Sequence, residues 1–137
     1  MEYATKYGVP LGFETMETPF LDTVEKGMRY VRTINSPYLG MYPDLGNLTN
    51  AAKLYGGSVA HDLCNGAGNI FAMHLKETIP GKYRDMAFGD GHVDFANGVQ
   101  TALTLGVRMF VAEYWHHGSA SWQEDIHGIH DFLRRYL

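Results

Sequence analysis

Four short apolar runs, each followed by a turn and a helical pattern, constrain the fold of this chain most strongly. The runs span residues 9–13, 38–42, 70–75 and 109–114. Strands with almost no polar residues are typical of parallel sheets, because helices cover such sheets and bury their strands. We therefore predict an α/β fold of the (βα)4 type, with parallel strands and helices outside.

Helical spacing of apolar residues follows the first and the third run. After the first run the pattern stops at the helix-breaking segment 35–37, Asn-Ser-Pro. After the third run, Asp94 is a candidate N-cap and Gly106 is placed to end the helix. The apolar positions are Phe20, Val24, Met28 and Val31 in the first helix, and Phe95, Val99, Ala102 and Leu103 in the second.

The remaining helices are predicted from different signals. Ser121 and Glu124 form a capping-box pattern ahead of a periodic apolar segment, which predicts a helix after the fourth run. The helix after the second run, around residues 49–63, is less well defined because Gly56 and Gly57 interrupt it. Residues 1–7 resemble the end of a helix that precedes the first strand.

Composition restricts the kind of protein. The chain has 137 residues, 45% of them hydrophobic, and a net charge of −4, which fits one globular domain. Its 11 basic residues form no run, so we expect neither a nucleic-acid partner nor a membrane surface. There is no apolar stretch of membrane-spanning length and no signal-peptide pattern. The single cysteine, Cys64, is interpreted as a small buried residue, and a cytoplasmic location is expected.

Each predicted strand ends at a side chain that can bind a metal ion: Glu14, Asp44, His74 and Glu113. These residues follow one another at about one βα unit, so in a parallel sheet they reach the same rim. A lone acidic residue here is usually a helix cap, and a lone histidine usually belongs to the core. Four such residues at corresponding strand ends favour a site for Mn²⁺, Mg²⁺, Co²⁺ or Zn²⁺. Gly46 would let the chain turn tightly after Asp44.

The segments around these residues resemble a known family. They are GFETMETP, INSPYLGMYPDLGNL, FAMHLKETIPGKYRDMAFGDGHVDF and FVAEYW. Together they closely resemble the carboxyl-terminal half of L-ribulose-5-phosphate 3-epimerases, also called L-xylulose-5-phosphate 3-epimerases or hexulose-6-phosphate isomerases. These enzymes are TIM barrels of the xylose isomerase-like superfamily. The resemblance extends from about Gly8 to Leu137 and implies that residues 1–137 form a single half-barrel domain.

The resemblance also implies a reaction and its residues. In that family the metal ligands fall on Glu14, Asp44, His74 and Glu113, the same positions reached from the strand ends. Glu14 and Glu113 would be the catalytic acid and base, with either glutamate in either role. They would interconvert L-ribulose 5-phosphate and L-xylulose 5-phosphate by proton transfer at C3 through an enediolate. The partner is then a phosphorylated ketose and the cofactor a divalent metal ion.

Several neighbouring residues are candidates for substrate binding. Asn47 and Lys76 could hold substrate hydroxyls or an enediolate oxygen, although Lys76 fits an ordinary solvated charge equally well. Arg84 and the loop 88–92 belong either to a phosphate-binding region or to a plain surface loop. His116 and His117 look like a metal pair, but adjacent side chains on an extended segment point apart, so they are interpreted as loop residues. Trp115 and Trp122 are interpreted as packing residues in preference to sugar platforms.

Four parallel strands are only half of a TIM barrel. An open half-barrel exposes its inner face and two unpaired edges, so we expect a homodimer or higher oligomer, with two halves closing a barrel or packing sheet to sheet. Two alternatives to the epimerase are open: a non-catalytic metal-binding remnant and a related ketose- or hexulose-phosphate isomerase. A metal-dependent endonuclease is disfavoured, because the chain lacks a basic groove for DNA.

Overall fold

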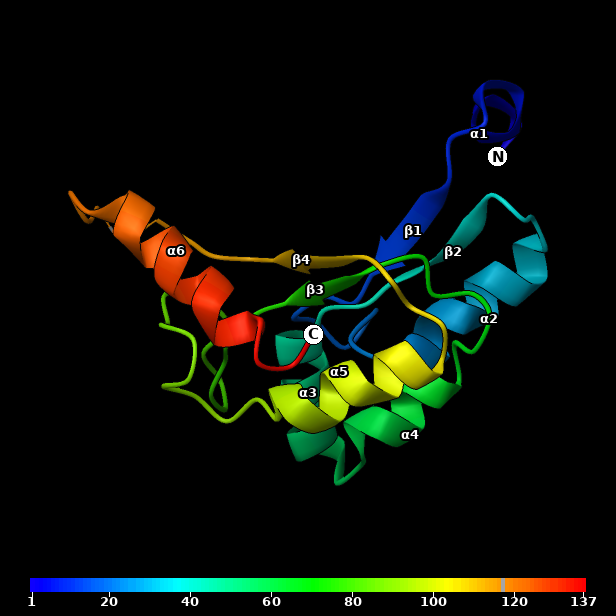
Figure 1. Ribbon diagram of the computed structural model, residues 1–137. Coiled ribbons are helices and arrows are strands. Elements are labelled where there is room, and N and C mark those ends of the chain that lie inside the picture. Colours follow the sequence, from blue (N-terminus) through cyan, green and yellow to red (C-terminus); the bar gives the residue numbers. More distant parts are fainter. Residues whose placement is uncertain (117) are drawn as a thin grey trace.

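Strands and helices alternate along the chain in the computed structural model, which describes residues 1–116 and 118–137 (Figure 1). No helix in this part of the chain is both long and apolar enough to cross a membrane. The elements are α1 (Glu2–Tyr7), β1 (Leu11–Glu14), α2 (Val24–Ile34), β2 (Leu39–Tyr42), α3 (Leu45–Tyr55), α4 (Val59–Cys64), β3 (Met73–Leu75), α5 (Phe95–Thr104), β4 (Phe110–Ala112) and α6 (Trp122–Leu133).

The strands are parallel and follow one another in chain order. β1 pairs with β2 and β3 pairs with β4. Two isolated parallel bridges, Met41 to Ile70 and Asp44 to His74, join the two pairs. The predicted parallel (βα)4 order is therefore confirmed, and all strands present their carboxyl ends at the same rim.

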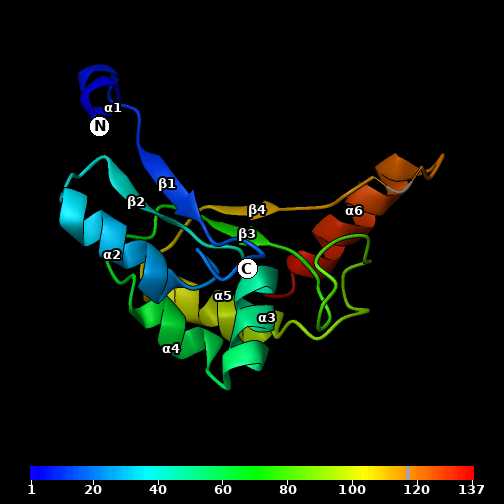
Figure 2. The same ribbon diagram turned by 180° about the vertical axis from the view of Figure 1, so that it is seen from behind.

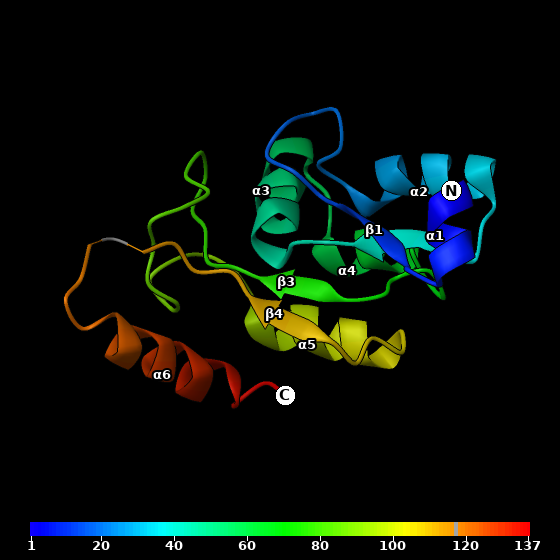
Figure 3. The same ribbon diagram turned by 90° about the horizontal axis from the view of Figure 1, so that it is seen from above.

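The helices are distributed unevenly around the strands. Helices α2, α3, α4 and α5 lie on one side of the sheet, while α1 projects at one end and α6 lies beyond β4 (Figures 1 and 2). Figure 3 shows β3 and β4 side by side, with α6 displaced outward from β4. This is the arrangement of a partial barrel, with helices outside the strands.

The hydrophobic core lies between the sheet and helices α2 to α5. Apolar side chains from both layers are fully buried there, and each contributes about 1.5–3 kcal/mol relative to an exposed position. Cys64 does not belong to this core: it is exposed, so its interpretation as a buried residue was wrong. The largest buried side chains are Met28, Met41, Leu45, Leu48, Leu63, Met73 and Leu75.

The helix boundaries follow the local signals in most places. Thr23 caps α2 and Asp94 caps α5, because their side chains accept the amides of Lys26 and Asn97. The helix predicted around residues 49–63 is two helices, since Gly56 adopts the left-handed conformation, φ 65°, and ends α3.

The capping box predicted for α6 does not form. Ser121 makes no side-chain cap bond, and its Oγ lies 3.0 Å from Ser119 Oγ instead. The hydroxyl of Ser119 is therefore the competing partner, which the capping-box pattern does not take into account.

Gly46 has a different role from the predicted turn. It lies in the first turn of α3, and a Cβ there would meet Thr78 Cγ2 at 2.7 Å and Lys76 O at 2.8 Å. The turn interpretation was wrong: Gly46 allows close approach of α3 to the chain that follows β3. This contact fixes the start of α3, and with it Asp44, against the strand that carries His74.

Candidate metal centre

Three of the predicted ligands converge at the carboxyl ends of the strands. Glu14 ends β1, His74 lies in β3, and Glu113 directly follows β4. One ligand atom from each lies within 4.8 Å of the others. His74 Nδ1 is 2.8 Å from Glu14 Oε1 and 3.7 Å from Glu113 Oε2. The three side chains could therefore hold one metal ion.

Asp44 lies beside this cluster but faces the interior. It is completely buried, and its Oδ1 accepts the amide of Asn47 at 2.7 Å as the N-cap of α3. Burial, together with the nearby carboxylates of Glu113 and Glu14, raises the pKa of Asp44 to about 7 against the opposing effects of the Lys76 ammonium and the Asn47 amide. The carboxylates at this rim therefore outnumber the positive charge beside them.

Lys76 connects Asp44 to the cluster. Its ammonium lies 3.6 Å from Asp44 Oδ1 and 3.3 Å from Glu113 Oε1, and the residue is only 4% exposed. The interpretation of Lys76 as a solvated surface charge is thus wrong. A buried ammonium between two carboxylates compensates part of their charge and fixes their positions.

Unpaired oxygens test whether these residues fit a metal ion. Asp44 Oδ2 and Glu113 Oε2 are buried without a hydrogen-bond partner in the structure described. Buried polar atoms are nearly always paired, so each such oxygen needs an explanation. A divalent cation would satisfy them, and three carboxylates with one imidazole are a donor set that such ions accept. The residues present therefore fit the metal.

The loop after β1 supports Asp44 through Thr15. The Thr15 hydroxyl is buried and accepts the amide of Asp44 at 2.9 Å. Asn47 Nδ2 donates to Thr15 O at 2.8 Å, whereas Asn47 Oδ1 is buried without a partner. Sequence reasoning missed Thr15, although its place directly after Glu14 was a usable signal.

Arg84 reaches the cluster through an aromatic side chain. Its guanidinium lies 3.0 Å from Glu17 Oε1 and stacks 4.8 Å from the Trp115 ring centroid. Trp115 Nε1 in turn donates to Glu113 Oε1 at 3.0 Å. Trp115 is 44% exposed, so its interpretation as a packing residue was wrong. Glu17 was not singled out from the sequence.

The long segment between β3 and α5 is anchored by Glu77, which sequence reasoning also missed. This buried carboxylate accepts the amides of Thr78, Gly89 and Val93. The Thr78 hydroxyl lies 3.1 Å from His92 Nε2. The predicted loop 88–92 is therefore attached to the segment that directly follows the carboxyl end of β3, the strand that carries His74.

Two further aromatic and histidine predictions concern the segment after β4. His116 is a loop residue, as predicted, and its Nε2 lies 3.2 Å from Ser119 O. His117 lies outside the described residues. Trp122 is 47% exposed at the start of α6, so it too is not a buried packing residue.

The fold and the residue pattern define a family. The model of the xylose isomerase-like TIM barrel matches residues 1–136. The chain therefore belongs to the xylose isomerase-like TIM barrel family.

The chain is also similar to particular curated proteins. The chain is 33% identical over 116 residues to L-ribulose-5-phosphate 3-epimerase UlaE of Escherichia coli strain SE11, and the protein of that name in Shigella boydii matches equally. The match covers 84% of this chain and 39% of the relative, so the chain spans less than half of the curated relatives it matches.

Solved structures show the same fold. D-psicose 3-epimerase from Clostridium cellulolyticum H10 superposes with a TM-score of 0.79 at 13% identity, over 99% of this chain and 52% of that chain. A xylose isomerase domain protein from Planctomyces limnophilus gives a TM-score of 0.77 at 19% identity, over 98% of this chain and 49% of that one. The chain thus corresponds to about half of each barrel.

Proposed function

We propose that this chain carries the metal centre and the proton-transfer residues of a sugar-phosphate epimerase. The proposed reaction interconverts L-ribulose 5-phosphate and L-xylulose 5-phosphate by proton transfer at C3. The observation that carries it is the convergence of Glu14, His74 and Glu113 within 4.8 Å at the strand ends. The likeness to L-ribulose-5-phosphate 3-epimerase supports the choice of substrate.

Glu14, Asp44, His74 and Glu113 would hold a divalent ion, which when bound stabilises negative charge on neighbouring substrate oxygens. Glu14 and Glu113 come from opposite edges of the sheet, with His74 between them. Epimerisation requires a proton to leave one face of C3 and another to arrive on the opposite face. Carboxylates on two sides of one site meet this requirement, whereas a lone base would return the proton to its original face.

Three residues are proposed to bind substrate. Asn47 Oδ1 has no hydrogen-bond partner in the described structure and can accept from a sugar hydroxyl. Lys76 carries its ammonium beside Glu113, where it can stabilise an enediolate oxygen. Arg84 is exposed and can pair with phosphate through its guanidinium group, which stacks on the Trp115 ring. We place this reaction in the cytoplasm.

Proton exchange at C3 tests the proposed function. The purified chain, loaded with Mg²⁺ or Zn²⁺ in D₂O, is incubated with L-ribulose 5-phosphate while proton NMR follows the C3 signal. We expect metal-dependent loss of the signal, because the proton removed is replaced by deuterium from solvent. Glu14→Gln and Glu113→Gln should each slow the exchange at least about 100-fold, the usual contribution of a general acid or base.

Glu124→Gln is the matched control, since Glu124 is an exposed glutamate on α6. It should exchange at the wild-type rate. A C3 signal that persists with metal bound would contradict the proposed activity of this chain. Equal exchange in wild type and both variants would reveal a contaminating enzyme.

A further inference from the structure

Both edges of the sheet are unpaired in the described structure. β1 pairs only with β2, and β4 pairs only with β3. An unpaired edge strand exposes backbone amides and carbonyls that can pair with another strand. Since all strands are parallel, the two edge strands β1 and β4 run in the same direction, and each has its unpaired side facing away from the sheet.

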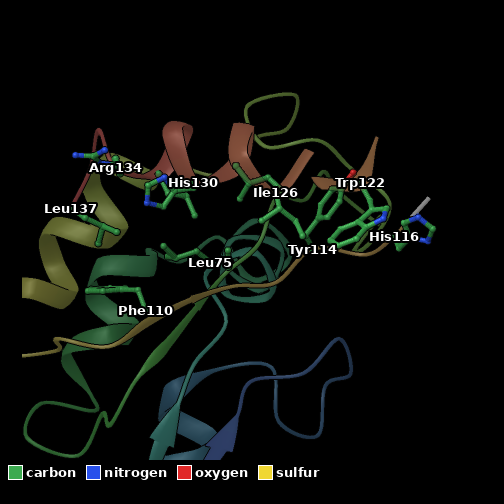
Figure 4. A pocket seen from close by; sticks show the side chains of 12 residues that line it. Leu75, Phe110, Tyr114, His116, Trp122, Ile126, His130, Arg134 and Leu137 are labelled. Atoms are coloured by element: carbon green, nitrogen blue, oxygen red, sulfur yellow. The ribbon is translucent and has the colours of Figure 1, made fainter. Parts of the chain in front are cut away.

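An apolar groove lies along the β4 edge (Figure 4). It has a volume of about 720 Å³ and separates β4 from α6. Phe110 and Ala112 of β4 form one wall, and Trp122, Ile126 and Leu133 of α6 form the other. Ile126 is 49% exposed, so the apolar face of α6 is only partly covered. The groove is thus the place where a further strand would pass beneath α6.

The β1 edge carries the complementary feature. α1 and the start of β1 project from the body of the molecule (Figures 1 and 2). Apolar and aromatic side chains are exposed along this projecting segment, which is unusual for so short a stretch. They are Tyr3, Tyr7, Val9 and Leu11, with exposures of 73%, 66%, 50% and 45%.

Side chains on the two edge strands that would meet in a pairing of β1 with β4 face the same side of the sheet. Phe13 packs against Tyr30 of α2, with ring centroids 5.9 Å apart, so it faces the helix layer. Leu11 shares that face because side chains two apart in a strand point the same way. Phe110 and Ala112 also face the helix layer at the other edge. A parallel pairing of β4 with a β1 strand therefore places Leu11 and Phe13 inside the groove.

We propose that a second copy of this chain occupies the groove, so that two half-barrels close one eight-stranded barrel. A two-fold axis along the barrel brings β4 of each copy beside β1 of the other, parallel both times. The chain covers 49–52% of the solved barrels named above, so two copies supply the complete set of strands. A second copy is favoured because one molecule carries both complementary surfaces.

The mass in solution gives the first test. We expect sedimentation equilibrium of the full chain at micromolar concentration to give twice the chain mass of 15.4 kDa. Ile126→Glu should yield monomers, because it places a charge inside the groove. Leu54→Glu is the matched control: Leu54 is an exposed apolar residue of α3 outside the groove, and the dimer should persist. A monomeric wild type, or an Ile126→Glu variant that remains dimeric, would overturn the proposal.

Cross-linking tests the geometry and separates barrel closure from sheet-to-sheet packing. In a Cys64→Ser background, one sample carries Leu11→Cys and another carries Phe110→Cys. A short bismaleimide should link the two chains when the samples are mixed, since the two positions are neighbours across the interface. Leu11→Cys alone should not cross-link, because the axis places the two Leu11 positions on opposite sides of the barrel. Efficient self-linking of Leu11→Cys, or no linking in the mixture, would refute the proposed closure.

Discussion

At the scale of residues, the candidate metal centre contains more carboxylates than ammonium groups. Asp44 and Lys76 are 0% and 4% exposed, and Glu113 and Glu14 add two further carboxylates. Removing charges from water costs several kcal/mol for each ion unless they are compensated. Lys76 lowers the pKa of Asp44, yet burial outweighs this effect and raises that pKa to about 7. A divalent cation would supply the missing charge.

Replacement of Lys76 tests this balance. We expect Lys76→Met to lower the free energy of unfolding of the metal-free chain by about 3 kcal/mol, because it leaves buried carboxylates without their cation. Urea denaturation measures the loss. Lys53→Met, at an exposed lysine of α3, should change stability by less than about 0.5 kcal/mol. Equal losses in the two variants would mean that the buried ammonium has no special role.

His92 should make stability depend on pH. Burial lowers the pKa of His92 below 6.5, and Lys53 lowers it further. Below pH 6.5 the unfolded chain therefore binds a proton at this position that the folded chain does not, so stability falls as the pH drops from 6.5 to the folded pKa. His92→Gln should weaken this fall. Denaturation curves of both proteins between pH 5 and 8 provide the measurement, and parallel pH profiles would contradict it.

At the scale of elements, the position of α3 is what joins Asp44 to the strand of His74. The first turn of α3 lies against the backbone of Lys76, and Gly46 makes this approach possible. Glu77 fixes the segment that follows β3 by accepting three backbone amides. The rim is therefore held by contacts between elements, not by the strands alone.

Gly46→Ala should destabilise the chain by about 2 kcal/mol, because the new Cβ meets backbone atoms that cannot move independently. Metal affinity should fall with it, since α3 carries Asp44. Gly57→Ala is the control, as nothing lies within 4 Å of the added Cβ there. Thermal denaturation and metal titration of both variants distinguish them. Wild-type stability of Gly46→Ala would show that α3 can shift without cost.

The sequence predicted those features that depend on local period or on strand phase. Parallel strands, the cap Asp94 and the convergence at the strand ends belong to this class. Thr15 and Glu77 were missed because their partners Asp44, Gly89 and Val93 lie at least 12 residues away in the chain. Asp94 follows a general preference of helix N-termini, whereas Ser121 shows that the same preference fails when another hydroxyl competes.

At the scale of the whole molecule, the described residues form a partial barrel whose four strands have their carboxyl ends at one rim. Both edges of the sheet are unpaired among the described residues, while the proposed ligands all come from one chain. If a second copy completes the barrel, metal binding should depend on it less than catalysis does, because the second copy would exclude water and add contacts to the substrate.

Metal stoichiometry tests the central claim most directly. Equilibrium dialysis against Zn²⁺, followed by elemental analysis, should give one ion per chain in the wild type. Asp44→Asn and His74→Asn should each weaken binding at least about tenfold, because each removes a donor from the site. Asp90→Asn, at an exposed carboxylate, should bind like the wild type. The absence of stoichiometric binding, or equal affinity in all variants, would contradict a metal centre at this rim.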